Sequence, residues 1–196
     1  MRRVCGLVVV CAVFGLGCGA TQTGNTGAAT RRTKLAESRE IEGYPCARGY
    51  AWFYSDGKLQ RCTVSQETQF GEARISAGSI IDLEPAGKPE GRLITQMTHA
   101  TVIAGVKCSG GNRLLGPSEG AMTAFYPSGK LEQCWLAGDQ SVQGVPCMRG
   151  GFMGFFGDGS KRGGGANFYE GGKLKSCTLA KDFGGKRRGD RFEQAE

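Results

Sequence analysis

The hydrophobic positions of this chain divide it into an apolar N-terminal stretch and a long region of short clusters. Residues 4–18 are apolar throughout and follow Arg2 and Arg3. No later apolar stretch is long enough to span a bilayer. The later clusters are aromatic or β-branched, end at glycine-containing turns, and show no sustained apolar period of 3.6 residues. This pattern predicts strands joined by tight turns, with little helix.

A motif of aromatic residues, a turn and a leucine recurs from Gly43 onwards. The leucines are Leu59, Leu93, Leu131 and Leu174, and they are 34, 38 and 43 residues apart. Spacings of this size are typical of repeat architectures. Phe-Tyr precedes three of the turns, whereas Asp82-Leu83 takes its place in the second unit. The chain is therefore expected to contain four related units within residues 43–180.

Each unit is expected to be a β-hairpin. Residues 51–54 and 58–64 flank Asp56-Gly57, and Asp-Gly supplies the positive φ that a tight turn requires. Leu59 and Cys62 are three positions apart, so an undistorted strand would place them on opposite faces. Either both faces are covered, or a bulge follows the turn. The predicted fold is an all-β, elongated antiparallel sheet of stacked hairpins.

Six of the nine cysteines occupy two fixed slots in these units. The first slot follows the glycine that opens a unit, and the second follows the leucine by three positions. The second unit has Ile75 and Gln96 in these slots and therefore lacks both cysteines. The loss of both together is expected if the two cysteines of a unit are bonded to each other. Six cysteines allow 15 connectivities. The slots favour three disulfides: Cys46–Cys62, Cys108–Cys134 and Cys147–Cys177.

The N-terminus is typical of a secretory signal peptide over residues 1–17. Gly15-Leu16-Gly17-Cys18 resembles the lipobox of bacterial lipoproteins, although that family prefers leucine where Gly15 stands. The resemblance implies that Cys18 is acylated and anchors the chain in a lipid bilayer. Gly19, in place of aspartate, favours the outer membrane, on either its periplasmic or its surface face. The alternative, an ordinary signal peptide, would leave Cys18 as a free thiol in an exported chain.

Residues 18–42 are expected to form a flexible tether, because Leu35 and Ile41 are their only large aliphatic residues. A short helix over residues 33–42 is compatible with the composition. Residues 181–196 are expected to form a charged tail, and the formal net charge of the chain is +7. Such a tail either aids solubility or binds an anionic envelope polymer or a protein partner. Nucleic acid is not expected, because no stacking platform accompanies the basic residues. These residues are Lys181, Lys186, Arg187, Arg188 and Arg191.

Catalytic and metal chemistry finds little support in the residue pattern. His99 is the single histidine, and no unassigned cysteine of the mature chain could serve it as a nucleophile. The cysteine spacings match neither zinc sites nor Cys-x-x-Cys redox centres, so no metal or cofactor is expected. No carboxylate spacing marks a glycosidase pair, although folding can assemble one. The carboxylates considered are Glu67, Glu72, Asp82, Glu84, Asp139 and Asp158.

Residues 150–167 are expected to form a long hairpin or inter-strand loop inserted into the fourth unit. Phe152, Met153, Phe155 and Phe156 either make an exposed apolar patch there or cap the last hairpin. Insertions in repeat proteins often lie on a binding face.

The unit Phe-Tyr-x-x-Gly-Lys-Leu-x-x-Cys resembles the MORN repeat, in which an aromatic–turn–glycine hairpin recurs along an extended sheet. The resemblance covers residues 43–180 and implies a scaffold or contact surface. The expected function is therefore a non-catalytic structural or binding role at the cell envelope. The alternatives are an envelope glycan-acting enzyme with a fold-assembled carboxylate pair, and a cysteine-based metal or redox protein.

Overall fold

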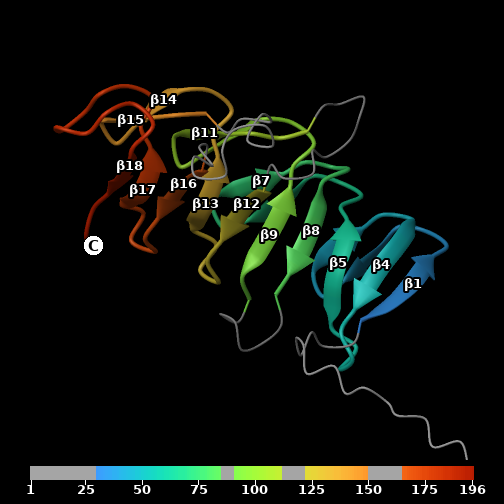
Figure 1. Ribbon diagram of the computed structural model, residues 1–196. Coiled ribbons are helices and arrows are strands. Elements are labelled where there is room, and N and C mark those ends of the chain that lie inside the picture. The colour runs from blue at the N-terminus through green and yellow to red at the C-terminus, as the bar shows by residue number, and fades with distance from the viewer. Residues whose placement is uncertain (1–29, 85–90, 112–121, 150–164) are drawn as a thin grey trace, which may run out of the picture.

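The computed structural model describes residues 30–84, 91–111, 122–149 and 165–196, and every regular element in those ranges is a strand. Ten strands form one antiparallel sheet in the order β1-β4-β5-β8-β9-β12-β13-β16-β17-β18 (Figure 1). Because this order follows the chain, the sheet is a meander, and the all-β prediction is confirmed. The strands are β1 (Arg31–Leu35), β4 (Gly49–Phe53), β5 (Leu59–Thr63), β8 (Ile80–Leu83), β9 (Leu93–Gln96), β12 (Met122–Phe125), β13 (Leu131–Trp135), β16 (Gly165–Phe168), β17 (Leu174–Thr178) and β18 (Arg191–Glu193).

Four small hairpins form a second layer over one face of this sheet. Each lies in the chain between two sheet strands that are not joined by a tight turn. Their inward residues, such as Ile75, Ile103 and Val142, belong to the same core cluster as Leu59, Leu93 and the other buried sheet residues. The small hairpins are β2 (Arg39–Ile41) with β3 (Tyr44–Cys46), β6 (Thr68–Phe70) with β7 (Ala73–Ile75), β10 (Thr101–Ile103) with β11 (Val106–Cys108), and β14 (Gln140–Val142) with β15 (Val145–Cys147).

The four repeated units correspond to the main hairpins β4–β5, β8–β9, β12–β13 and β16–β17. In the first, the backbone N–H of Gly57 donates to the carbonyl of Tyr54 at 3.0 Å, and that of Tyr54 donates to Lys58 at 2.9 Å. Gly57 has φ +87°, a conformation that glycine adopts without strain. The same bonds recur at Tyr126 and Tyr169. The predicted tight turns are therefore present in these three units.

A β-bulge follows the turn in the same three units. In the first, Trp52 pairs with Arg61 whereas Phe53 pairs with Leu59, so one extra residue is inserted in β5. The bulge turns Leu59 and Cys62 toward the same covered face, where each is 1% exposed. Of the two explanations left open by the sequence, the bulge is the correct one.

The second unit lacks this bulge, and its equivalent positions shift as a result. Ile81 pairs with Cys62 on one side and with Thr95 on the other. Thr95 is fully buried and therefore occupies the second cysteine slot. The assignment of Gln96 to that slot is wrong, because Gln96 follows Thr95 in an undistorted strand and points to the other face.

The place of the Phe-Tyr pair in the second unit also shifts by one residue. Leu83 lies opposite Leu93, as Phe53 lies opposite Leu59. The N–H of Glu84 donates to the carbonyl of Arg92 at 3.0 Å, as tyrosine does in the other units. Leu83-Glu84, rather than Asp82-Leu83, therefore replaces the aromatic pair.

Both ends of the predicted repeat domain extend further than expected. β1 pairs along the whole of β4, and Leu35 is only 3% exposed, so residues 31–42 are neither a tether nor a helix. At the other end, β18 pairs with β17, and Phe192 packs against the core. In these short segments the sheet edge pairs the backbone groups, and Leu35 and Phe192 contribute to the core. Residues 18–29 lie outside the described ranges.

Candidate binding surface on the open face of the sheet

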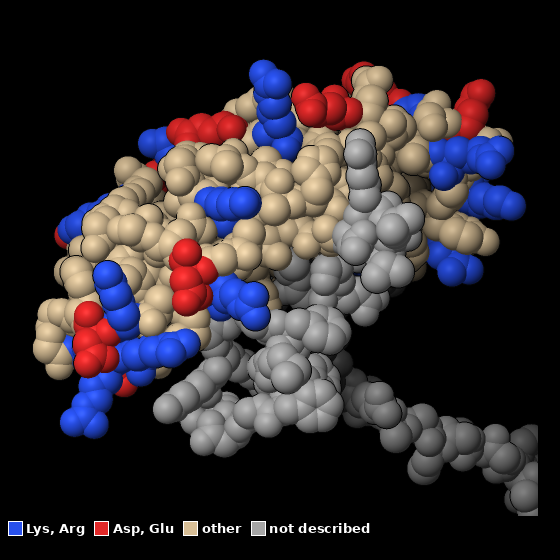
Figure 2. Space-filling view, turned by 90° about the horizontal axis from the view of Figure 1, so that it is seen from above, with Lys and Arg blue, Asp and Glu red and all other residues tan. Residues whose placement is uncertain are grey.

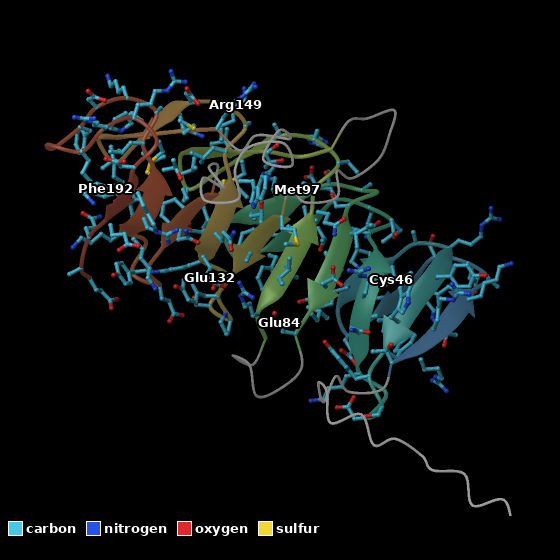
Figure 3. The ribbon with its side chains drawn as sticks, in the orientation of Figure 1. Cys46, Glu84, Met97, Glu132, Arg149 and Phe192 are labelled. Carbon is cyan, nitrogen blue, oxygen red and sulfur yellow. A yellow bond between two sulfur atoms is a disulfide. The ribbon has the colours of Figure 1, made fainter. Side chains whose placement is uncertain are left out.

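The six cysteines of the repeat are bonded as the slots predict. Each bond joins the last residue of a small hairpin to the second strand of a main hairpin, with Cα–Cα distances of 5.5 to 5.7 Å. No cysteine of these pairs is more than 2% exposed. The bonds therefore join the two layers covalently (Cys46 is labelled in Figure 3). They are Cys46–Cys62, Cys108–Cys134 and Cys147–Cys177. Cys18 lies outside the described residues.

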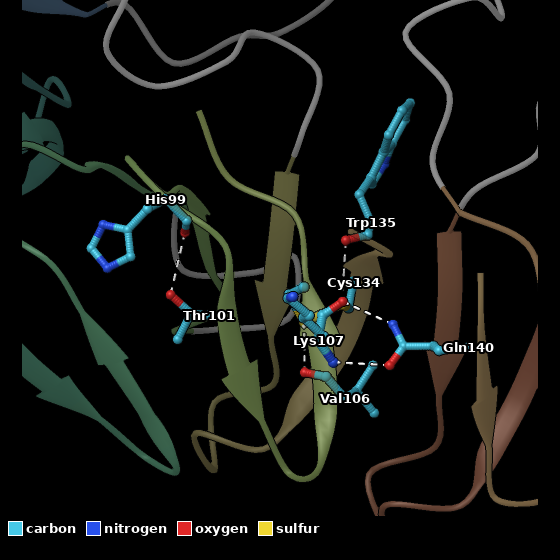
Figure 4. The surroundings of a disulfide bond; sticks show 8 residues. His99, Thr101, Val106, Lys107, Cys134, Trp135 and Gln140 are labelled. Atoms are coloured by element: carbon cyan, nitrogen blue, oxygen red, sulfur yellow. Dashed lines mark hydrogen bonds between the residues drawn. A yellow bond between two sulfur atoms is a disulfide. The ribbon is translucent and has the colours of Figure 1, made fainter. Parts of the chain in front are cut away.

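Around the second bond, neighbouring small hairpins are also joined directly. The side-chain amide of Gln140 donates to the carbonyl of Lys107 at 2.9 Å, and the N–H of Lys107 donates to Gln140 Oε1 at 3.1 Å (Figure 4). The N–H of Ser109 donates to the carbonyl of Trp135. These bonds join the small hairpin β10–β11 both to the next small hairpin and to β13 of the sheet.

His99 is exposed just after β9, in the segment that leads to β10. Its Nδ1 lies 3.2 Å from Thr98 Oγ1, and its backbone carbonyl accepts a bond from Thr101 (Figure 4). These contacts order the local turn. In the part of the chain that the structure describes, no group of three or more His, Cys, Asp or Glu residues could hold a metal ion.

Folding does bring two carboxylates together, at the ends of the central strands. Glu84 Oε1 lies 3.1 Å from Arg92 Nη1, and Glu132 accepts a bond from Arg92 Nε (labelled glutamates in Figure 3). Burial opposes the charge on Arg92, but the hydrogen bond and charge of Glu132, with those of Glu84, outweigh it and raise the guanidinium pKa. The site is a salt-bridge triad with an arginine at its centre.

The other carboxylates singled out in the sequence have local roles. Asp82 accepts two hydrogen bonds from the guanidinium of Arg61. The carboxylate of Asp139 accepts a bond from the N–H of Arg149 at 2.7 Å. Glu67 lies 3.9 Å from Arg74 at the surface. Glu72 occupies the turn of a small hairpin, and Asp158 lies outside the described residues.

The sheet face opposite the small hairpins, here called the open face, carries mainly polar and aromatic side chains. None of the described strands packs on it. One row of cross-strand neighbours traverses it from β1 to β18: Arg32, Trp52, Arg61, Asp82, Ile94, Ala124, Gln133, Asn167, Ser176 and Glu193. The open face is therefore one continuous surface, on the side of the sheet away from the small hairpins.

Aromatic and cationic side chains gather at the β1 end of this face. The Tyr50 and Trp52 rings lie 6.5 Å apart, tilted by 54°, and Tyr50 is 46% exposed. The guanidinium of Arg32 sits 4.2 Å above the centre of the Tyr50 ring, and that of Arg61 lies 5.9 Å from the Trp52 ring. We call these four residues the aromatic platform.

Basic residues extend from the platform along β1. Arg31, Arg32 and Lys34 are all exposed, and Figure 2 shows Lys and Arg side chains clustered at this end of the molecule. Within the described ranges, none of the three forms a salt bridge. Arg32 and Lys34 lie opposite Trp52 and Tyr50 on the open face, whereas Arg31 lies opposite the buried Phe53, so the charges that border the platform are those of Arg32 and Lys34.

The C-terminal basic segment is folded and partly compensated by acids. The N–H groups of Arg187 and Arg188 donate to the carboxylates of Asp190 and Asp182, each at 2.8 Å. Arg191 pairs with Glu193 at 2.6 Å. The expected loose basic tail is thus an ordered turn and edge strand with charges of both signs.

The sequence reasoning missed the platform. The available signal was the alternation of Tyr50 and Trp52 with the buried Ala51 and Phe53, continued across β1. Of the insertion at residues 150–167, residues 165–167 belong to β16. Phe152, Met153, Phe155 and Phe156 lie outside the described residues, so the expected patch stays a prediction.

No protein-family model, curated protein or solved structure matches this chain. Among the described residues, no helix is long and apolar enough to cross a membrane. The class of the protein therefore follows from its own architecture, which is an all-β sheet of repeated hairpins stapled by disulfides.

Proposed function

We propose that this chain is an exported, lipid-anchored envelope protein whose folded part is a non-catalytic binding or structural module. The signal-like N-terminus, the lipobox-like Gly15-Leu16-Gly17-Cys18 and three buried disulfides support export to an oxidising compartment. β1 begins at Arg31, so only residues 19–30 separate Cys18 from the sheet. Such a short connection would hold the module close to the membrane.

The observation that carries this proposal is the difference between the two faces of the sheet. The covered face holds the core and the disulfides, whereas the open face presents Tyr50, Trp52, Arg32 and Arg61. Tyr, Trp and Arg are the residue types that dominate binding hot spots. A continuous sheet face with such residues suits contact with an extended partner. The recurrence of the hairpins supports a MORN-like assignment, a class that serves as a scaffold or contact surface.

The intact mass of the native, detergent-extracted protein tests the anchor and the bridges together. Thiols are alkylated before and after reduction. The proposal requires a chain that begins at Cys18 with added acyl mass, no reactive thiol before reduction, and six alkylated cysteines after it. A chain without lipid would contradict the anchor. Several free thiols would contradict the structural role of the cysteines and favour a metal or redox function.

A further inference from the structure

We propose that the aromatic platform binds an anionic polysaccharide, with sugar rings packed on Trp52 and Tyr50 and acidic groups held by Arg32 and Lys34. This inference deepens the proposed function, on which it rests, by giving the binding module a ligand class. It is carried by three observations: the aromatic surface on an ordered strand, the polar pair beside it, and positive charge at its edge that forms no salt bridge among the described residues.

The aromatic rings are held on a strand with little freedom to move. β4 lies between β1 and β5, and the residues that alternate with the rings, Ala51 and Phe53, are buried in the core. The less polar face of a sugar ring exposes C–H groups, which pack against an aromatic face. Exposed rings on an ordered strand therefore suit an extended glycan, since aromatic side chains offer a large apolar surface at low entropic cost.

A fixed polar pair adjoins the Trp52 ring. Arg61 donates through Nε and Nη2 to the two carboxylate oxygens of Asp82, and the side chains are 42% and 21% exposed. A bidentate pair of this kind has a defined geometry. Its remaining N–H donors and oxygen lone pairs face solvent, where sugar hydroxyl groups, which both donate and accept, can satisfy them.

The charge at the edge of the platform selects an anionic polymer. Arg32 and Lys34 lie on the edge strand opposite Trp52 and Tyr50, and neither forms a salt bridge within the described part of the chain. The guanidinium of Arg32 covers one face of the Tyr50 ring, so a sugar that packs on the exposed remainder of that side chain lies directly beside the charge. A cluster of one sign raises the local concentration of the opposite charge and makes binding sensitive to salt.

The two tryptophans of the chain allow a direct test. The Trp135→Phe variant leaves Trp52 as the reporter, and Trp52→Phe leaves Trp135, which lies five strands away on β13, or about 24 Å. Full-length protein is titrated with polygalacturonate, with dextran sulfate and with neutral dextran at low salt. We expect a saturable change in Trp52 fluorescence with the carboxylated polymer, the sulfated polymer or both, no change with neutral dextran, and no change in Trp135 fluorescence. A signal confined to Trp135, or no binding of either acidic polymer, would overturn the inference.

A charge-matched pair of double variants provides the second test. Arg32→Gln with Lys34→Gln removes two charges at the platform, and Arg187→Gln with Arg188→Gln removes two at the far end. All four side chains are exposed, so both variants should fold. We expect the first to weaken polysaccharide binding at least tenfold and the second less than twofold. Equal losses would show that only the net charge matters, and the platform would then be excluded.

Duplex DNA and anionic lipid vesicles complete the experiment as competitors. If either binds as tightly as the acidic polysaccharide and with the same dependence on Trp52, the site recognises polyanions in general and the inference fails. The mass measurement on Cys18 is independent of these titrations. A lipidated chain that binds no polysaccharide would refute the platform and leave the envelope module standing.

Discussion

Gly71 lies so close to Gly129 that a Cβ atom on either residue would overlap the backbone of the other. Gly71 stands at the tip of the small hairpin β6–β7, and Gly129 in the tight turn between β12 and β13. Next to this contact, Phe70 packs edge-on against Phe125, with ring centres 5.7 Å apart. The small hairpin of the second unit therefore rests on the main hairpin of the third, and the two units are interlocked.

The first prediction concerns this contact. Gly71→Ala should destabilise the protein more than Gly144→Ala, which changes the tip of another small hairpin with nothing within 4 Å. Both glycines have positive φ, so both variants lose about 1 kcal/mol from backbone strain. In Gly71→Ala the new Cβ atom also overlaps the backbone of Gly129, and we expect this overlap to lower the free energy of unfolding by a further ~1–3 kcal/mol. Urea unfolding measures both, and equal losses would contradict the interlock.

A fourth disulfide can be introduced into the second unit. Ile75 and Thr95 occupy the positions that cysteines fill in the other units, and both are fully buried. We expect the variant with Ile75→Cys and Thr95→Cys to form a disulfide. Its two new cysteines should resist alkylation before reduction and become alkylated after it. The variant with Ile75→Cys and Gln96→Cys should keep both thiols free, because residue 96 points to the open face. A bridge in the second variant would show that the bulge-free register is wrong.

The triad around Arg92 should contribute to stability. Arg92→Met leaves Glu84 and Glu132 without their partner, and we expect a loss of about 1–3 kcal/mol in the free energy of unfolding. The control is Arg74→Met. The salt bridge between Arg74 and Glu67 is largely exposed, so its loss should lower the free energy of unfolding by less than about 0.5 kcal/mol. Replacing both glutamates by glutamine in the Arg92→Met background should recover part of the loss. An unchanged midpoint for Arg92→Met would refute this role.

Tyrosine ionisation should limit stability at alkaline pH. The hydroxyl of Tyr54 donates to the carbonyl of Leu83 at 2.6 Å, and that of Tyr126 to Phe168 at 2.9 Å. Burial, followed by nearby carboxylate charges, raises the pKa of both tyrosines above the model-peptide value of 10.0. The unfolded chain therefore ionises first, so this stabilisation is complete below pH 10 and is lost as the pH rises toward the folded pKa values.

The measurement is the unfolding midpoint between pH 8 and pH 12 for the native chain and for Tyr126→Phe. The variant should lose about 1 kcal/mol at neutral pH, because the bond to Phe168 is absent. Above pH 10, the unfolding midpoint of Tyr126→Phe should fall less steeply with pH than the midpoint of the native chain. Parallel curves would indicate that Tyr126 does not contribute to the alkaline transition.

The hairpins and the disulfides could be predicted because both follow from short sequence motifs that repeat along the chain. Asp56-Gly57 and its counterparts define tight turns without reference to the rest of the fold, and the cysteine slots repeat with those turns. The second unit was misaligned because counting from Leu93 assumes a bulge that this unit lacks. Whether a strand contains a bulge depends on its pairing, which composition does not reveal.

The ends of the domain and the platform depend on contacts distant in sequence. Residues 31–35 are too polar to indicate a strand by themselves, and they become one because β4 offers a free edge. Arg32 is placed beside Tyr50 and Trp52 only by that pairing. The platform could therefore not be found before the register of β1 was known.

Each disulfide of this fold joins a cysteine to the next cysteine along the repeat domain, with separations of 16, 26 and 30 residues. A chain that emerges N-terminus first into an oxidising compartment would thus find each correct partner as the next thiol to arrive. Cleavage before Cys18 would remove Cys5 and Cys11, and acylation of Cys18, as proposed, would block the remaining upstream thiol that could intercept Cys46. The protein would then mature with an enzyme that makes disulfides and would need none that reshuffles them.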